Sequence, residues 1–339
     1  MGEDINLEAA SLMDGKKKIR PVLRVVVFIC IFCVILYFLC DIFEYKNNYL
    51  AQRYKLYKQL EPGTVDAVMI GTSGIDRSWI AAKGFEKFGF TVYPFSTDAL
   101  PCWIALDMIR EAYKYQTPKL VVLDMRMFTL YDPANAVELS KTRSRRAIDT
   151  LDFFSLNRLD AINRTQKVIH EADPDEYRFE ISYFFSFIQY HSMWADEGFK
   201  PFSQIGSSPS KYLGFYLTKN SIKSIELQES FWTDEKMELT EIAVDSLNEI
   251  LEYCSENNIE LLFIDTPHSL NESQMKRTNM LCDILDSKDI KYVRYSDREW
   301  YNLDGEFSDA LSVNDDGSYT VTDFETVEDG SNYLQSAQK

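Results

Sequence analysis

The fold is decided by the stretch VDAVMIGTSGIDRSWIAAKGF, which covers residues 65–85. Its first six residues are apolar except for Asp66, and they have the length of a buried strand. The glycine-containing corner GTSG (71–74) follows, and residues 75–88 are predicted to form a helix. A strand that turns directly into a helix is typical of a βαβ unit, and the corner then lies at the carboxyl end of the strand.

The same alternation returns along the rest of the chain. Further strands are predicted over residues 90–95, 119–125, 259–264 and 290–295, and further helices after Pro101 and over 236–256 and 271–288. Strands that are nearly continuous in apolar residues and are joined by helices predict an α/β domain with a doubly wound parallel sheet. A large aromatic-rich insertion is predicted over about residues 127–235.

The composition is that of a folded and acidic protein. The 339 residues are 45% apolar and 14% aromatic, so a substantial core can form. The formal net charge is −17, and no basic stripe offsets it. A surface of this sign repels phosphate backbones, and nucleic acid is therefore excluded as a partner.

An uncharged run, VVVFICIFCVILYFLC (25–40), predicts one transmembrane helix over residues 22–43. Five basic residues precede it without an intervening acid: Lys16, Lys17, Lys18, Arg20 and Arg24. By the positive-inside rule, residues 1–21 are then a cytoplasmic tail, and the main domain of this single-pass cell-membrane protein is extracytoplasmic. The run could instead be a cleaved signal peptide or a buried core helix, but no small-x-small cleavage site follows it.

Residues 44–63 are predicted to form a polar helical stalk, and residues 64–339 the extracytoplasmic domain. Cys30, Cys33 and Cys40 lie in the span, and the other three cysteines are widely spaced, with no CxxC and no His/Cys metal spacing outside the span. A packed core rather than disulfides is therefore expected to hold this domain together. No cofactor and no metal are expected. The acidic tail, about 302–339, contains LSVNDDGSYTVT (311–322), which predicts a hairpin and matches a calcium loop poorly.

Five segments, taken in order, resemble the SGNH/GDSL hydrolase superfamily, in particular a membrane-anchored surface branch of it. They are DAVMIGTSG (66–74), ALPCWIALDMIREAYKYQTPKLVVLD (99–124), FFSLNRLDAI (153–162), QYHSMW (189–194) and FIDTPHS (263–269). The resemblance covers about residues 65–300 and implies a flavodoxin-like, SGNH-type fold. Related architectures include proteins of polysaccharide O-acetylation and of D-alanyl transfer.

The resemblance implies a serine-dependent site at the GTSG corner. Ser73 would be the nucleophile, His268 the base and Asp265 the carboxylate that orients it. Ser96 and Asp124 fall where the family places oxyanion donors, although the family uses glycine and asparagine there. The residues expected to contact substrate are Gly71, Thr72, Gly74, Ser96, Asp124, Tyr190, His191 and Trp194.

The closing Asp-x-x-His block of the family has no counterpart here, because the nearest local match, DFETVED (323–329), carries Thr326 and Asp329 at those positions. Two hypotheses follow. The first is a membrane-anchored esterase or O-acyltransferase, expected to act on acetyl groups, that uses Ser73 on a cell-surface polysaccharide and its acyl donor.

The second hypothesis is a catalytically inactive module that binds glycan or docks onto a membrane-bound O-acyltransferase. The residues of the corner by themselves also fit a plain helix-capping role for Ser73, or a phosphate-binding turn at residues 71–74.

Overall fold

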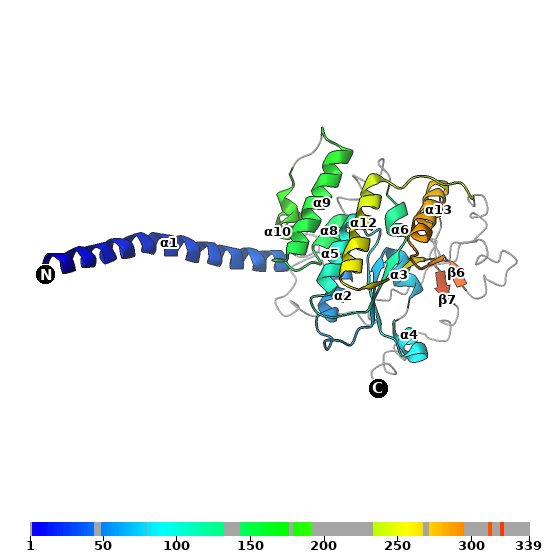
Figure 1. Ribbon diagram of the computed structural model, residues 1–339, viewed down its shortest axis with the longest axis horizontal. Helices are drawn as coiled ribbons and strands as arrows, with labels where there is room; N and C mark the ends of the chain where they lie inside the picture. The colour runs from blue at the N-terminus through cyan, green and yellow to red at the C-terminus, as the bar shows by residue number, and fades with distance from the viewer. Residues whose placement is uncertain are drawn as a thin grey trace. The chain divides into compact units, whose positions relative to one another are not determined.

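The computed structural model describes residues 2–43, 49–79, 81–131, 143–175, 179–191, 233–266, 271–294, 311–313 and 319–321 (Figure 1). Contacts within the chain divide the structure into two units. The first contains α1 (Gly2–Ile42), the 3₁₀ turn η2 (Ile181–Tyr183) and α10 (Ser186–Tyr190). The second, here called the sheet unit, contains the remaining elements.

The sheet unit is built on a five-stranded sheet in the order β2-β1-β3-β4-β5, and every strand pair is parallel. The strands are β1 (Ala67–Gly71), β2 (Val92–Ser96), β3 (Leu120–Asp124), β4 (Glu260–Asp265) and β5 (Tyr292–Arg294). This is the strand order of flavodoxin-like doubly wound sheets. The predicted α/β class and parallel sheet are confirmed, and each strand overlaps its predicted position with a shift of one or two residues at its ends.

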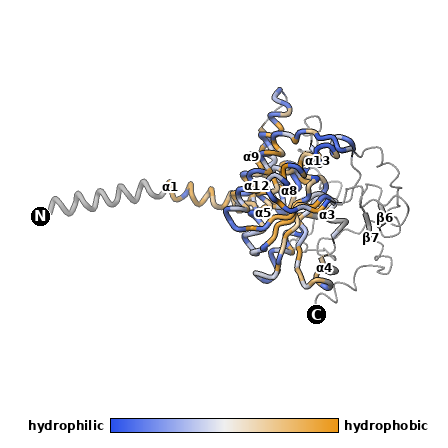
Figure 2. The backbone as a smooth tube through the Cα atoms, turned by 45° about the vertical axis from the view of Figure 1, so that its right-hand side comes forward, coloured by the Kyte–Doolittle hydropathy of each residue, from blue (hydrophilic) through white to orange (hydrophobic). Residues whose placement is uncertain are grey.

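Alternate strand residues face two different helical layers. On one face, Ile75 and Trp79 pack with Ala67, Met69, Val92 and Val122. These two residues belong to α3 (Ser73–Ser78) and its C-cap, and α4 (Ala81–Phe88) also contacts β2 on the sheet. On the other face lie α2 (Tyr49–Tyr57), α5 (Cys102–Ala112) and α12 (Glu241–Glu256). Figure 2 shows that the hydrophobic residues gather on the strands between these layers.

The structure differs from the predicted stalk, because α2 packs inside the sheet unit. Leu50, Tyr54 and Tyr57 are at most 1% exposed and lie four and three residues apart, so they form one face of the helix. The Tyr57 ring lies 4.7 Å from the ring of Phe95 on β2, between centroids. The hydroxyls of Tyr54 and Tyr57 donate to the carbonyls of Glu111 and Ala112 at the end of α5.

The predicted helix over residues 75–88 is interrupted. Helix α3 ends at Ser78, and its C-cap Trp79 has extended backbone angles of φ −118° and ψ 126°. This conformation is compatible with the packing of the Trp79 ring on the core cluster under the sheet, and a second helix, α4, starts at Ala81. A periodicity argument could not find this break, because the pattern of apolar residues continues across it.

The predicted insertion contributes α6 (Arg126–Thr129), α8 (Arg145–Ile148) and α9 (Leu156–Ala172) to the sheet unit. Helix α13 (Glu272–Ser287) follows β4 and begins with a capping box between Asn271 and Gln274. In the acidic tail, β6 (Leu311–Val313) and β7 (Tyr319–Val321) pair antiparallel, as the predicted hairpin requires. Strand β7 lies against α3 (Figure 1), whereas residues 314–318, where the turn was predicted, are outside the described residues.

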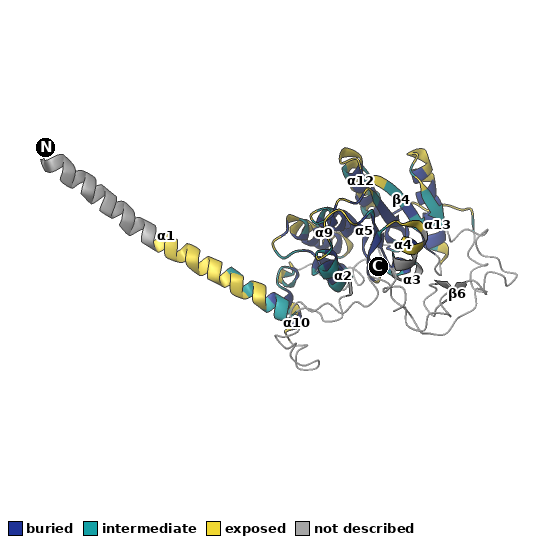
Figure 3. Cartoon of the chain, turned by 90° about the horizontal axis from the view of Figure 1, so that it is seen from below, coloured by how far each residue is buried: buried dark blue, intermediate teal, exposed yellow. Residues whose placement is uncertain are grey.

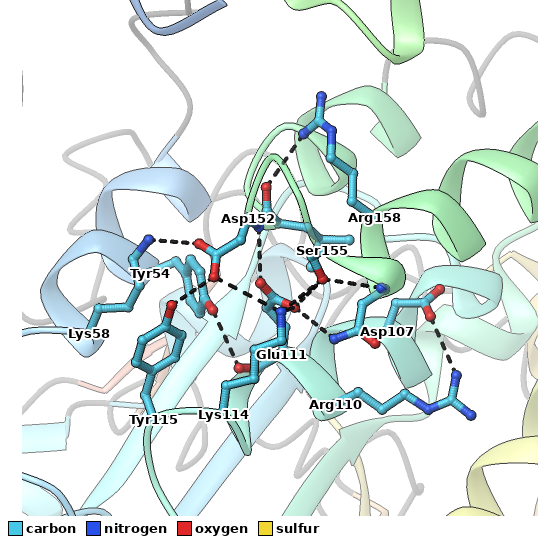
Figure 4. Close-up of polar contacts among 12 residues, drawn as sticks. Tyr54, Lys58, Asp107, Arg110, Glu111, Lys114, Tyr115, Asp152, Ser155 and Arg158 are labelled. Carbon is cyan, nitrogen blue, oxygen red and sulfur yellow. Dashed lines mark hydrogen bonds and ion pairs between the residues drawn. The ribbon is translucent and has the colours of Figure 1, made fainter. Parts of the chain in front are cut away.

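A polar network joins α5 to the start of α9 around the buried carboxylate of Glu111 (Figure 4). This carboxylate accepts from the Asp152 amide at 3.0 Å, the Ser155 hydroxyl at 2.9 Å and the Asn157 amide group at 2.7 Å. Lys114 pairs with it at 2.6 Å. Ser155 is the N-cap of α9, so Glu111 fixes the start of that helix on α5.

In the first unit, residues Pro21–Ile42 of α1 form a helix that is long and apolar enough to cross a membrane. Its residues are largely exposed from Val22 to Phe38 (Figure 3). All six cysteines are unpaired thiols, and the three in the sheet unit, Cys102, Cys254 and Cys282, are buried. The sheet unit is therefore held together without disulfides by its core.

Candidate active site

The candidate site lies at the carboxyl edge of the sheet, where β1 and β3 adjoin. From β1 the chain leaves toward β2 on one side, and β3 lies on the other side, so the direction of winding reverses between them. Doubly wound sheets bind their ligands at this switch point. The GTSG corner follows β1 directly, and Asp124 ends β3 beside it.

The two glycines of the corner are required by close packing. A Cβ atom on Gly71 would lie 2.3 Å from the Cβ of Asp124, and one on Gly74 would lie 2.1 Å from the Oγ1 of Thr266. Neither distance is sterically allowed, so both positions need a residue without a side chain. Gly71 thus brings β1 against Asp124, and Gly74 brings α3 against the chain that leaves β4.

Thr72 is fully buried and is the N-cap of α3. Its backbone N–H and its hydroxyl both donate to Oδ2 of Asp124, at 2.9 Å and 2.5 Å. The other oxygen of Asp124 accepts from the Arg126 amide at 3.1 Å. Burial raises the pKa of Asp124, while the hydrogen bonds from Thr72 act in the opposite direction. Thr72 and Asp124 therefore lock the corner and are both fully buried, and their contact with substrate stays a prediction.

Ser73 differs from its three neighbours in the corner. It is partly exposed, and its hydroxyl makes no hydrogen bond to any residue that the structure describes. The capping role considered for Ser73 falls to Thr72 instead, whose hydroxyl accepts from the Gly74 amide at 3.5 Å. Within the corner, Ser73 is thus the residue whose side chain remains available for chemistry.

Ser96, at the carboxyl end of β2, is fully buried. Its carbonyl and hydroxyl oxygens accept hydrogen bonds from the Arg53 guanidinium, at 2.7 Å and 3.0 Å. Arg53 belongs to α2 and is 3% exposed. These contacts give Ser96 a structural role at the end of β2, and its contact with substrate stays a prediction.

The loop after β2 contains one strained position, Ala99, whose φ of 49° lies in the left-handed region. This region costs a residue with a Cβ about 1 kcal/mol. We expect Ala99→Gly to raise the free energy of unfolding by about 0.5–1 kcal/mol, measured by urea denaturation. Ala105→Gly within α5 is the control and should lower it by about 1 kcal/mol or more. Loss of stability in Ala99→Gly would contradict the assigned conformation.

The second group of predicted residues follows β4. Asp265 ends β4 and is 1% exposed, and Thr266 is fully buried against Gly74 of α3. Residues 267–270, which include His268, lie outside the described residues. Through Thr266, the chain that leaves β4 therefore contacts α3, the helix that begins with Ser73.

The remaining predicted contacts do not belong to the sheet unit. Tyr190 is buried in α10, and His191 is its exposed C-cap, with Nδ1 2.7 Å from the Ile188 carbonyl. Both belong to the unit that contains α1, so their contact with substrate stays a prediction. Trp194 lies outside the described residues.

Sequence reasoning missed Arg53 and Thr266 at this edge of the sheet. Arg53 lies in a segment interpreted as a stalk, although the apolar stripe of Leu50, Tyr54 and Tyr57 on the same helix indicates a packed helix. Thr266 carried no recognisable signal, since its importance depends on contact with Gly74, 192 residues earlier in the chain.

Comparisons with known proteins add little to this description. No protein-family model matches the sequence, and no curated protein matches it. Among solved structures, the chain is similar to a Bacteroides fragilis protein described as a "putative acylhydrolase", with 12% identity over 87% of this chain and 97% of that chain and a TM-score of 0.33. At this TM-score, the fold assignment depends on the strand order and register given above.

Proposed function

We propose that this chain is a membrane-anchored serine esterase or O-acyltransferase of the SGNH type, and that it acts on a cell-surface polysaccharide through Ser73. The observation that carries the proposal is the geometry of the GTSG corner. Both glycines and Thr72 are committed to packing and hydrogen bonds, whereas the Ser73 hydroxyl has no partner among the described residues. It lies at the edge where doubly wound sheets bind ligands.

His268 is the base in this proposal. The other two histidines of the chain are His170, exposed on α9, and His191, exposed in the other unit. His268 follows Thr266 by two residues, which span at most about 7 Å of chain. Since Thr266 packs against Gly74, a chain of this length is long enough for His268 to act on the neighbouring Ser73 in the proposal. Asp265, buried at the end of β4, supplies the carboxylate that orients the imidazole.

The proposed reaction has two halves. The Ser73 oxygen attacks the carbonyl carbon of the acyl donor while His268 takes the hydroxyl proton, and backbone N–H groups of the corner stabilise the oxyanion. The alcohol of the donor leaves with that proton, and an acyl-enzyme remains. A sugar hydroxyl or water then attacks the carbonyl carbon of the acyl-enzyme and gives its proton to His268, which passes the proton to the departing Ser73 oxygen as the new ester or acid is released.

In the proposal, Pro21–Ile42 of α1 anchors the protein in the cell membrane. The basic residues before this helix orient the N-terminus toward the cytoplasm, so that the sheet unit faces the cell exterior. The acidic surface suits neutral or cationic partners better than anionic ones.

The alternative is an SGNH-like module without catalysis, which binds glycan or docks onto a membrane-bound O-acyltransferase. The observation that favours it is the sequence at residues 323–329, where Asp329 occupies the position of the expected histidine. A carboxylate at that position is too weak a base to activate a serine near pH 7.

A fluorophosphonate probe distinguishes the two functions. We expect the full-length chain in detergent micelles to form an adduct on the peptide that contains Ser73, and Ser73→Ala to lose it. Ser287→Ala, which removes an exposed hydroxyl at the end of α13, should label like the wild type. A folded protein that stays unlabelled, but binds glycan equally with Ser73 or Ala at this position, would establish the non-catalytic alternative.

A further inference from the structure

The C-terminal end of the predicted membrane span is covered by a second segment of the chain. The Ser186 hydroxyl of α10 donates to the carbonyl oxygen of Cys40 at 3.1 Å. Cys40 is 7% exposed, whereas Phe38, only two residues earlier, is 53% exposed. Helix α10 therefore docks on the last turn of the span, and η2 packs against α10; both belong to the same unit as α1.

The segment docked there is unusually apolar for a water-exposed helix. Residues 181–190 read ISYFFSFIQY and contain no charged residue. Ile181 is 52% exposed, and Phe184, Phe185, Phe187 and Ile188 are each partly exposed. The rings of Phe185 and Phe187 lie 6.2 Å apart. A patch of this kind in water marks an interaction surface.

The position of Cys40 along α1 determines how deep in the bilayer residues 181–190 would lie. The 22 residues of Pro21–Ile42 make a helix about 33 Å long, close to the thickness of the hydrocarbon core of a bilayer. Cys40 is two residues from the end of that span, so a segment bonded to its carbonyl lies at the boundary between acyl chains and headgroups. Aromatic residues are enriched at this boundary, where short apolar helices also lie.

We propose that residues 181–190 are a second membrane-contacting element, which lies in the outer interface of the bilayer with its phenylalanines among the lipids. This inference rests on the part of the proposed function in which α1 spans the membrane. In chain order, the segment lies between α9 and α12, both of the sheet unit. The polypeptide therefore passes between the sheet unit and the membrane-associated unit at residues 181–205 as well as after α1.

The occupant of the patch can be identified by photo-crosslinking. The full-length chain, with p-benzoylphenylalanine in place of Phe187, is placed in vesicles made of equal parts of phosphatidylglycerol and phosphatidylethanolamine, irradiated and weighed by intact-mass spectrometry. We expect an adduct of phospholipid mass. Phe32, 48% exposed in the span, is the positive control, and Phe154, 73% exposed in the sheet unit, is the control for random capture.

The controls separate the possible failures. Lipid adducts at Phe32 but not at Phe187, or a yield at Phe187 no higher than at Phe154, would overturn the inference. Adducts at Phe187 that carry only protein mass would also overturn it, and they would identify the patch as a surface for another membrane protein. Absence of lipid adducts at Phe32 would instead contradict the membrane anchor of the proposed function. Equal urea midpoints of the variants and the wild type show that each variant is folded.

Discussion

Glu111→Ala is expected to lower the free energy of unfolding by about 3–5 kcal/mol, since it removes one partner from a buried charged network. The Glu111 carboxylate is fully buried and accepts hydrogen bonds from the Asp152 amide, the Ser155 hydroxyl and the Asn157 side chain. Alanine would leave these donors and the Lys114 ammonium without their acceptor. The measurement is urea unfolding of the full-length chain in detergent micelles, followed by tryptophan fluorescence.

Two further variants make this result specific. Glu111→Gln keeps one acceptor oxygen but loses the charge that Lys114 contacts, so its stability should lie between those of the wild type and Glu111→Ala. Glu171→Ala removes a carboxylate of α9 whose side chain is 57% exposed, and it should change stability by less than about 0.5 kcal/mol. A loss below about 1 kcal/mol for Glu111→Ala would show that the network does not hold α9 on α5.

The second large effect concerns Asp107 on α5. Its side chain is fully buried, and neither carboxylate oxygen has a hydrogen bond to a described residue. Arg110 and Arg164 approach these oxygens only to 3.8 Å and 3.9 Å. Burial raises the pKa of Asp107 to about 7, and the nearby Arg164 offsets this only in part.

The raised pKa gives a definite sign to the pH dependence of stability. Between pH 4 and pH 7 the folded chain holds a proton on Asp107 that the unfolded chain has released, because an unfolded aspartate has a pKa of about 3.9. The stabilisation from this group is therefore fully present below pH 4 and is lost as the pH rises through 7, in total about 4 kcal/mol. Other groups add their own pH dependence, so the effect must be measured as a difference from a variant.

Asp107→Asn removes the titration and nearly keeps the shape. The stability of this variant relative to wild type should rise by about 3–4 kcal/mol between pH 4.5 and pH 8, measured by urea unfolding at each pH. Asp245→Asn, on the exposed side of α12, is the matched control, and its difference from wild type should be similar at both pH values. A constant difference for Asp107→Asn would mean that the arginines keep Asp107 ionised throughout.

The sequence predicted the sheet of this protein well, because parallel strands covered on both faces are continuous apolar runs. It was less informative where two distant segments meet. Helix α2 was interpreted as a stalk, although Tyr54 and Tyr57 pack on β2 and the end of α5. Contacts of this kind join residues about 40 to 60 positions apart, and no local pattern encodes them.

In the candidate site, too, the local pattern was predictable from the sequence and the contacts between distant residues were not. The position of Ser73 after β1 followed from the strand-to-helix pattern alone. The roles of its neighbours did not, since Thr72 and Asp124 are 52 residues apart and form their hydrogen bonds only in the folded sheet. The sequence predicts Thr72 and Asp124 as substrate contacts, which stays a prediction, and only the structure shows that they also hold the corner in place.

The central claim is that Ser73 is activated by His268, and the three histidines of the chain allow a direct test. The measurement is the rate at which a fluorophosphonate labels Ser73 in His170→Asn, His191→Asn and His268→Asn. We expect only His268→Asn to lose rate, by about 10²–10⁴-fold, because a general base contributes that much to attack by a serine. Labelling of all three variants at the wild-type rate would contradict the claim.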